Sequence, residues 1–168
     1  ASIEDLISYR LKNEKLISKI ENKKIKIKNL GFFDLNIFKN KLDNLTHSVI
    51  SKGKFSLNRS PRVRVISIKK FNKLENLKNN NFLKSIKYLS QFSIFALIII
   101  KNETFDINKN ESIKSTNILR YYGIGAQIIK DLKIKKMVLV SRSKKKIIGL
   151  DGYGIKITKQ EIIKWKKK

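Results

Sequence analysis

The side-chain types that usually carry enzyme chemistry are scarce in this chain. Its 168 residues include no cysteine, and His47 is the single histidine. A zinc site needs three or four thiolate, imidazole or carboxylate ligands, so we expect no metal here. A lone histidine on an alternating strand such as His47 is more typical of a structural role than of a ligand. Glu4, Asp5 and Asp131 lie at the ends of predicted helices, where capping and the helix dipole explain acidic side chains.

The charge of the chain is extreme but has a simple explanation. The formal net charge is +26, and only six of the 39 basic residues are arginines, which phosphate and base recognition favours. The chain is also rich in asparagine and isoleucine, so codons rich in A and T explain the composition without a ligand. We therefore favour compositional bias, and expect weak, salt-sensitive, non-specific polyanion binding. A domain recruited for RNA or ribosome binding is the alternative.

Hydrophobic periodicity predicts one domain with an antiparallel first half and an alternating second half. Helical patterns, the first with Ser2 and Asp5 as a capping pair, cover residues 3–20, 82–91, 117–132 and 144–150. Strand patterns cover residues 24–28, 33–38, 46–51, 62–68, 93–100, 136–140 and 154–158. Polar stretches predict an exposed loop or a ragged helix start at residues 71–81 and a loop at 101–115. The predicted fold is α/β (α+β), a mixed sheet with flanking helices.

No segment predicts a membrane span. The most apolar run, residues 92–100, is less than half of the ~20 residues that a spanning helix needs, and is typical of a buried strand. The first residues have neither the basic start nor the apolar stretch of a signal peptide. With no cysteine for disulfides, we expect a cytoplasmic protein.

Two blocks in the second half of the chain resemble GTP cyclohydrolase II. Residues 119–129, LRYYGIGAQII, are similar to the family's L-R-D-Y-G-I-G-A-Q-I-L, and residues 145–154, KKIIGLDGYG, are similar to K-K-I-V-G-L-E-G-Y-G. Residues 2–11, SIEDLISYRL, resemble the segment that ends the synthase half of bifunctional riboflavin-biosynthesis proteins, which fuse this domain to 3,4-dihydroxy-2-butanone 4-phosphate synthase. The resemblance implies a linker helix at residues 1–20, a degenerate cyclohydrolase II-like domain at 21–160 and a basic tail at 161–168.

The resemblance also implies a reaction whose residues are missing here. In the family a zinc ion held by three cysteines activates water, an Asp acts as general base, and an Arg attacks the α-phosphate of GTP. Ile66, Ile68 and Lys69 stand where the family has a His, a Glu and the first Cys. Ile118 stands at the position of the catalytic Asp. We therefore expect no zinc, no other cofactor and no cyclohydrolase activity.

Four positions keep residue types that the resemblance places at the nucleotide. Thr104, Ser141 and Lys146 match family contacts with GTP, and Arg120 matches the nucleophilic Arg. A packing or charge role suits Arg120 better, and a solvated lysine run suits Lys146 at least as well. These four residues are our nucleotide-binding candidates, with weak GTP or phosphate binding as the expectation.

Two glycines inside the predicted helix over residues 117–132 need a reason. Glycine in a helix interior costs about 1 kcal/mol relative to alanine. For Gly123 and Gly125 we favour close packing against the sheet over phosphate cradling.

The favoured hypothesis is a catalytically inactive GTP cyclohydrolase II-like domain of riboflavin biosynthesis. It would act as a structural, dimerisation or regulatory partner of butanone-phosphate synthase. A nucleotide-binding sensor without turnover and the RNA- or ribosome-binding domain are the alternatives, and an enzyme with metal-free chemistry ranks last. Because the family is typically dimeric, we expect a homodimer.

Overall fold

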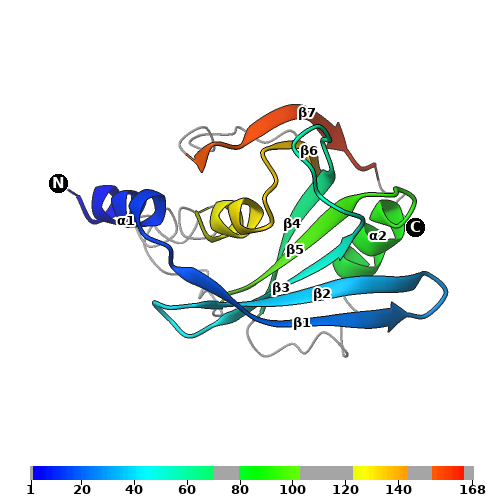
Figure 1. Cartoon of the computed structure of the whole chain (residues 1–168), viewed down its shortest axis with the longest axis horizontal. Coiled ribbons are helices and arrows are strands. Elements are labelled where there is room, and N and C mark those ends of the chain that lie inside the picture. The colour runs from blue at the N-terminus through cyan, green and yellow to red at the C-terminus, as the bar shows by residue number, and fades with distance from the viewer. Residues whose placement is uncertain (1, 70–79, 103–122, 144–152, 165–168) are drawn as a thin grey trace.

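A seven-stranded mixed sheet organises the part of the chain that the computed structural model describes, residues 2–69, 80–102, 123–143 and 153–164. The strand order is β1-β2-β3-β5-β4-β6-β7 (Figure 1). The strands are β1 (Ile17–Ile27), β2 (Gly31–Asn40), β3 (Thr46–Lys52), β4 (Arg62–Lys69), β5 (Phe95–Asn102), β6 (Lys136–Ser141) and β7 (Lys156–Ile162). The helices are α1 (Ile3–Asn13), α2 (Asn80–Leu89) and a helix over residues 123–131.

The sheet has an antiparallel part and a parallel part. β1, β2, β3 and β5 pair antiparallel, whereas β5, β4, β6 and β7 run parallel to one another. Parallel neighbours need crossover connections, which the alternating second half supplies. The predicted mixed sheet with flanking helices is therefore confirmed.

A tight turn joins the first two strands. Asn29 and Gly31 both have positive φ, 68° and 106°, a conformation that asparagine and glycine adopt most easily. β1 is an edge strand whose exposed side chains are mostly lysines, and charged side chains on an edge discourage pairing with another sheet.

The core lies on both faces of the central strand β5, which is apolar from Phe95 to Ile100 and buried throughout. Ala96, Ile98 and Ile100 pack with the helix over residues 123–131. Phe95, Leu97 and Ile99 pack with α2 on the opposite face. A central strand with both faces covered reads as a continuous apolar run, which is why its pattern did not alternate.

The first predicted helix was too long. α1 begins with the expected capping box between Ser2 and Asp5 but ends at Asn13, and Glu14 is extended with φ −113° and ψ 140°. Leu16 and Ile17 are buried where the chain enters β1, so their apolar spacing belongs to a strand and its approach. Residues 14–20 are therefore not helical, in contrast to the prediction.

The last strand is also displaced from its predicted place. We expected residues 154–158, but β7 runs from Lys156 to Ile162 and so enters the predicted tail. Beyond β7, the Ile163 N–H donates to the Ser141 carbonyl oxygen at 2.8 Å. The predicted helix over residues 144–150 and most of both predicted loops lie outside the described residues. Within the described ranges, no helix is both long and apolar enough to cross a membrane.

Candidate functional site

The carboxyl ends of the parallel strands form the first place to look for a site. In open sheets of this kind, ligands bind outside these ends. The carboxyl ends of β4, β5 and β6 lie at the same end of the sheet. β4 pairs with β6 only through Arg62 and Val63, so the two strands separate beyond that point. Of the four nucleotide-binding candidates, Ser141 is the last residue of β6, and Thr104, Arg120 and Lys146 lie outside the described residues.

The hydroxyl and the carbonyl oxygen of Ser141 both form hydrogen bonds within the chain. Its side chain is buried, and its Oγ donates a hydrogen bond to the Ser143 carbonyl oxygen at 2.7 Å. Its own carbonyl accepts from the Ile163 N–H. Ser141 therefore closes the turn after β6 and holds the chain beyond β7, and a phosphate oxygen would have to displace the Ser143 carbonyl to accept a hydrogen bond from its hydroxyl.

The end of β4 is packed with apolar side chains. We call this region the β4 edge: Ile66 and Ile68 with the α2 residues Phe82 and Ile86. All four side chains are buried in one cluster. Ile66 and Ile68 are the positions at which the resemblance implies a His and a Glu, and hydrocarbon side chains cannot bind a metal or accept a proton. No three His, Asp or Glu side chains gather at a metal-binding spacing in the described ranges, so the residues present do not fit a zinc site.

Arg64 is a buried cation beside the β4 edge. Its Nε donates to Ser85 Oγ at 2.8 Å and its Nη2 to Asn81 Oδ1 at 2.9 Å, both on α2. A third donor, Nη1, reaches the Val140 carbonyl oxygen at 3.4 Å. Arg64 thereby fixes α2 to the sheet. This role was not predicted, although Arg64 shares a strand face with the buried Ile66 and a charged residue on that face was a usable signal.

His47 lies on the opposite face of the sheet. It lies two residues before Val49 on β3 and so on the same face, and Val49 packs in the cluster beneath the helix over residues 123–131. The Lys101 N–H donates to His47 Nδ1 at 3.0 Å, and Nε2 is buried with no hydrogen-bond partner in the described part of the chain. Burial, aided by the charge of Lys101 and opposed by that of Asp43, lowers the pKa of His47 to about 4. A structural role fits, but only one ring nitrogen is satisfied.

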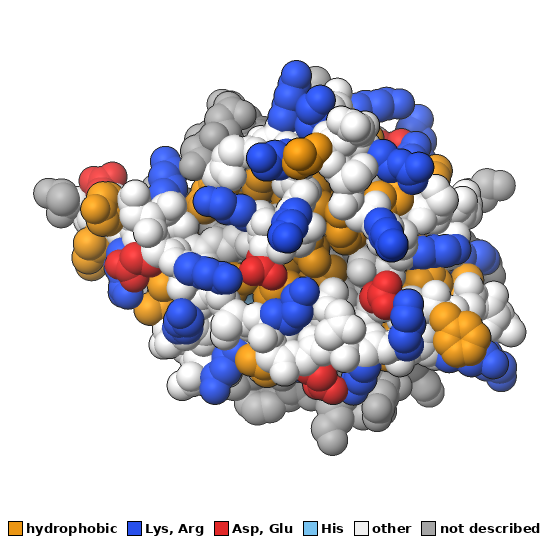
Figure 2. Space-filling view, viewed as in Figure 1, with side chains coloured by type: hydrophobic (Ala, Val, Ile, Leu, Met, Phe, Trp, Pro, Cys, Tyr) orange, Lys and Arg blue, Asp and Glu red, His pale blue; other side chains and the backbone are white. Residues whose placement is uncertain are grey.

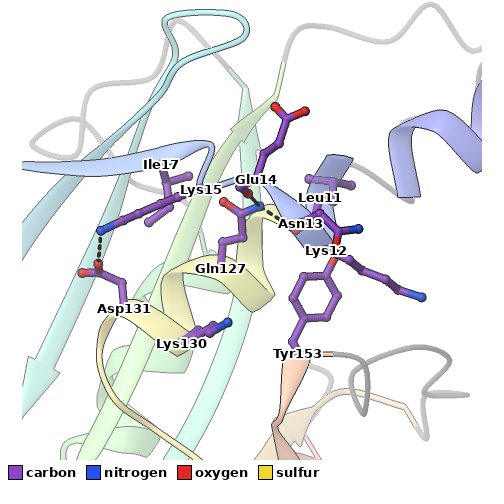
Figure 3. A pocket seen from close by; sticks show the side chains of 10 residues that line it. All are labelled: Leu11, Lys12, Asn13, Glu14, Lys15, Ile17, Gln127, Lys130, Asp131 and Tyr153. Carbon is purple, nitrogen blue, oxygen red and sulfur yellow. Dashed lines mark hydrogen bonds and ion pairs between the residues drawn. The ribbon is translucent and has the colours of Figure 1, made fainter. Parts of the chain in front are cut away.

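A second place of interest is the contact between the end of α1 and the helix over residues 123–131, which we call the α1 joint. Gln127 is its centre, with its side chain pointing at the chain that leaves α1 (Figure 3). Gln127 Nε2 donates to the carbonyl oxygens of Leu11 (2.8 Å) and Glu14 (3.0 Å). Gln127 Oε1 accepts from the Leu16 N–H at 2.9 Å. One buried amide thus satisfies three backbone groups where the helix ends.

Gly123 lets α1 approach this closely. A Cβ at Gly123 would lie 2.4 Å from Leu11 Cδ1, so any larger residue there would force the buried leucine to move. We predicted packing against the sheet, and this was wrong for Gly123, whose neighbour is α1. Gly125 does face the sheet, but its nearest neighbour, Ile100 Cδ1, is at an ordinary 3.7 Å. Neither glycine is close enough to the sheet to be required by it.

An ion pair adds to the joint. Lys15 Nζ lies 3.3 Å from Asp131 Oδ1 (Figure 3). We expected Asp131 to be explained by its place at a helix end, and in the structure it also pairs with Lys15. The lysine is exposed, so the pair contributes little stability by itself, typically under ~1 kcal/mol. The pair instead orients the chain, because it connects the residues just before β1 to the last residue of the helix over residues 123–131.

A pocket of about 350 Å³ opens beside the joint, lined by the residues labelled in Figure 3. The amides of Gln127 and Asn13 in its lining are hydrogen-bonded to backbone groups. The carboxylates of Glu14 and Asp131 are paired with Arg10 and Lys15. Burial raises the pKa of Tyr153, whose ring forms one wall. No nucleophile with an adjacent base occurs among these lining residues, so the pocket offers no catalytic arrangement.

A polar cluster connects β4, β7 and α2. Arg62 binds Glu161 through two hydrogen bonds (3.1 and 3.3 Å) and stacks 3.6 Å above the Phe92 ring centroid. The Tyr88 hydroxyl donates to Glu161, and burial together with this bond raises the pKa of Tyr88 to about 12. Burial opposes ionisation of Glu161, but the bonds from Tyr88 and Arg62 outweigh it and lower the pKa. The cluster fastens the edge strand β7 and was not predicted.

Comparisons with known proteins identify the kind of domain this is. A model of the GTP cyclohydrolase II family matches residues 77–161, half of the chain. A 3,4-dihydroxy-2-butanone 4-phosphate synthase of Sulfurospirillum multivorans is 36% identical over 165 residues, which cover 94% of this chain and 41% of the relative. The riboflavin biosynthesis protein RibBA of Chlorobium phaeovibrioides is 26% identical over 182 residues, which cover 95% of this chain and 44% of the relative.

A solved structure shares the fold. RibBX, a two-domain 3,4-dihydroxy-2-butanone 4-phosphate synthase from A. baumannii, superposes with a TM-score of 0.66 at 21% sequence identity. The match covers 98% of this chain and 45% of that chain. In all three comparisons with whole proteins, the chain therefore spans less than half the length of the protein it matches.

Proposed function

Because this chain belongs to the GTP cyclohydrolase II family, we propose that it is a member that does not carry out the family's reaction and instead serves as an accessory domain of a 3,4-dihydroxy-2-butanone 4-phosphate synthase. The setting is riboflavin biosynthesis, the pathway named for its relatives. The proposal has a chemical part, the absent reaction, and an assembly part, the synthase partner.

The β4 edge carries the chemical part. Ile66 and Ile68 are not just non-ligands but contributors to a closed apolar cluster with α2, so the region has been built for packing. A zinc ion and its water cannot be placed among buried isoleucines without losing that packing. Cysteine is also missing from the whole chain, and the family's zinc is held by cysteines.

The relatives support the assembly part. The Sulfurospirillum multivorans protein and the two-domain A. baumannii protein are both named for synthase activity alone, yet nearly all of this chain matches a portion of each. A cyclohydrolase-like portion therefore accompanies proteins named for a different reaction. This is the pattern expected when a fold is kept after its chemistry is lost.

Polyanion binding is a weaker candidate. The lysines visible in Figure 2 are spread over the whole face and do not gather in one groove. Such a surface favours weak, salt-dependent attraction to any polyanion and offers no defined footprint. We therefore keep charge as a property of the surface and do not assign it as the function. Of the four candidates for a nucleotide sensor, Ser141 is the one within the described residues, and its hydroxyl already donates to Ser143.

The proposed loss of the reaction is tested by incubating the purified, untagged chain with GTP, Mg²⁺ and added Zn²⁺, and measuring formate and pyrophosphate release. The expected result is no release above a protein-free control, with an active GTP cyclohydrolase II as the positive control. Sustained formate release would overturn the proposal. Calorimetry with GTP, ATP and pyrophosphate completes the test, and saturable GTP-selective binding would favour the sensor.

A further inference from the structure

The helix α1 presents an apolar face that nothing in the described structure covers. Ile3, Leu6 and Tyr9 are 74%, 57% and 63% exposed. Their spacing of three residues places them on successive turns along one side of the helix. Figure 1 shows α1 at one end of the molecule, away from the sheet, and Figure 2 shows hydrophobic side chains gathered there. Exposed apolar stripes of this kind mark interaction sites.

The helix is held in place while this face stays free. Among the described side chains of α1, only Leu11 is buried, and it sits on Gly123 at the α1 joint. The capping box at Ser2 fixes the first turn, and the ion pair from Arg10 to Glu14 supports the last. An isolated helix of 11 residues is marginal in water, so a packed partner is expected for α1.

The composition of α1 also differs from that of other exposed elements. No lysine or arginine precedes Arg10, whereas the exposed face of β1 is mostly lysine. A bias toward lysine codons acts on every exposed position alike. The absence of lysine around Ile3, Leu6 and Tyr9 therefore indicates a surface where a positively charged side chain would weaken an apolar contact.

The size of the stripe indicates the kind of partner. Three such side chains expose on the order of 400 Å², against the ~800 Å² per partner that stable complexes of separate proteins bury. Two free copies of this chain would therefore associate poorly through it, and the expected homodimer would need another surface. A tethered neighbour needs less area, because the tether raises its effective concentration.

We propose that the face formed by Ile3, Leu6 and Tyr9 docks onto the synthase portion that accompanies this domain, which makes α1 the element that couples the two. This rests on the proposed function for its partner. The structural match to the two-domain synthase leaves only 2% of this chain outside, so the shared fold takes in α1 together with the domain. The α1 joint then transmits the position of that portion to the sheet through Gln127.

The absence of cysteine allows a direct test of this surface. Leu6→Cys is placed in the chain alone and in a fusion in which this chain replaces the matching portion of the Sulfurospirillum multivorans synthase. The rate of maleimide labelling at that peptide is read by mass spectrometry. The control is Leu57→Cys, which is 58% exposed and lies between β3 and β4. Retained synthase activity reports that the fusion folds.

Leu6→Cys should be labelled at least tenfold more slowly in the fusion than in the chain alone, and Leu57→Cys equally fast in both. Equal labelling rates of Leu6→Cys in the chain alone and in the fusion would overturn the proposal. Slow labelling of Leu6→Cys in the chain alone, together with a dimer in analytical sedimentation, would also overturn it, because the face would then be covered by a second copy. A second fusion, to the Photobacterium phosphoreum synthase, replaces the first if it is inactive. Formate release tests the absent reaction independently, so the two proposals fail separately.

Discussion

The α1 joint and the β4 edge differ in how far their residues follow the family motif. At the joint, Gln127 and Gly123 keep the residue types of the family motif, and each has a specific structural task in the close approach of α1. At the β4 edge, Ile66 and Ile68 depart from the motif and form packing that the family's polar residues could not. The residues that hold these elements together are kept, whereas Ile66, Ile68 and Ile118 stand where the resemblance implies polar residues, although Arg120 is retained. This division is the one expected if, as proposed, the fold is kept and the reaction is lost.

The largest expected effect breaks the joint. Gln127→Leu removes the partners of the Leu16 N–H and the Leu11 carbonyl, and unpaired buried backbone groups cost ~1–3 kcal/mol each. We expect the free energy of unfolding to fall by about 4 kcal/mol. Urea denaturation measures it, with the exposed neighbour Lys130→Ala as the control, which should change stability by less than about 0.5 kcal/mol. Equal, small losses in both variants would deny Gln127 its role.

The β4 edge can be probed by restoring the polar side chain that the resemblance implies. Ile66→His places an imidazole in an apolar cluster with no partner prepared for it, and should lower the free energy of unfolding by about 3 kcal/mol without producing formate from GTP. Lys39→His, on the exposed surface of β2, is the matched control. If Ile66→His left the stability unchanged, the edge would not be built for packing.

His47 lies on the face of the joint and gives a pH-dependent comparison. Its pKa is lowered from 6.5 to about 4, so the unfolded chain takes up a proton as the pH falls below 6.5 while the folded chain does not. Stability contributed by neutral His47 is therefore complete above pH 6.5 and lost between pH 6.5 and about 4. The loss amounts to about 3 kcal/mol.

The check for His47 is urea denaturation at pH 7.5 and 4.5 for the parent chain and His47→Gln, whose amide oxygen still accepts from the Lys101 N–H. The acidic groups titrate in both proteins and cancel. The parent should lose more stability on acidification, and parallel losses would mean that His47 titrates normally.

The smallest expected effect concerns the polar cluster of Arg62, Tyr88 and Glu161 that fastens β7. Glu161→Gln keeps the shape but weakens the bonds from Arg62 and Tyr88, and should cost about 1 kcal/mol because the cluster is only part-buried. The pKa of Tyr88, raised by burial and by Glu161, should move back toward its ordinary value in an absorbance titration. An unchanged titration would show that burial alone sets it.

Local patterns predicted the sheet well and the joint poorly. The continuous apolar run at residues 93–100 predicted β5, the alternation of lysine with isoleucine at residues 24–28 predicted part of β1, and Ser2 with Asp5 predicted the start of α1. The end of α1 was misplaced because Leu16 and Ile17 continue an approximately helical spacing although they belong to the approach and start of β1. Spacing alone cannot separate a helix from a short helix followed by a strand.

The long-range contacts had weaker signals. Gln127 meets a backbone group 111 residues away, and its one local mark is a single amide inside an apolar helix. Gly123 was correctly taken as a packing glycine, but its neighbour, Leu11, belongs to an element far away in sequence. Among the nucleotide-binding candidates, Ser141 is described, and its burial and its bond to Ser143 depend on a turn that composition does not reveal.

Zinc content tests the central claim most directly. The untagged chain would be expressed with zinc in the medium, dialysed against metal-free buffer and analysed for zinc per polypeptide. If the domain has lost the cysteines that hold zinc in the family, and packs apolar side chains at the β4 edge, zinc should be far below one ion per chain, and added chelator should leave the unfolding midpoint unchanged. One tightly held zinc per chain, with a midpoint that falls on chelation, would contradict the account.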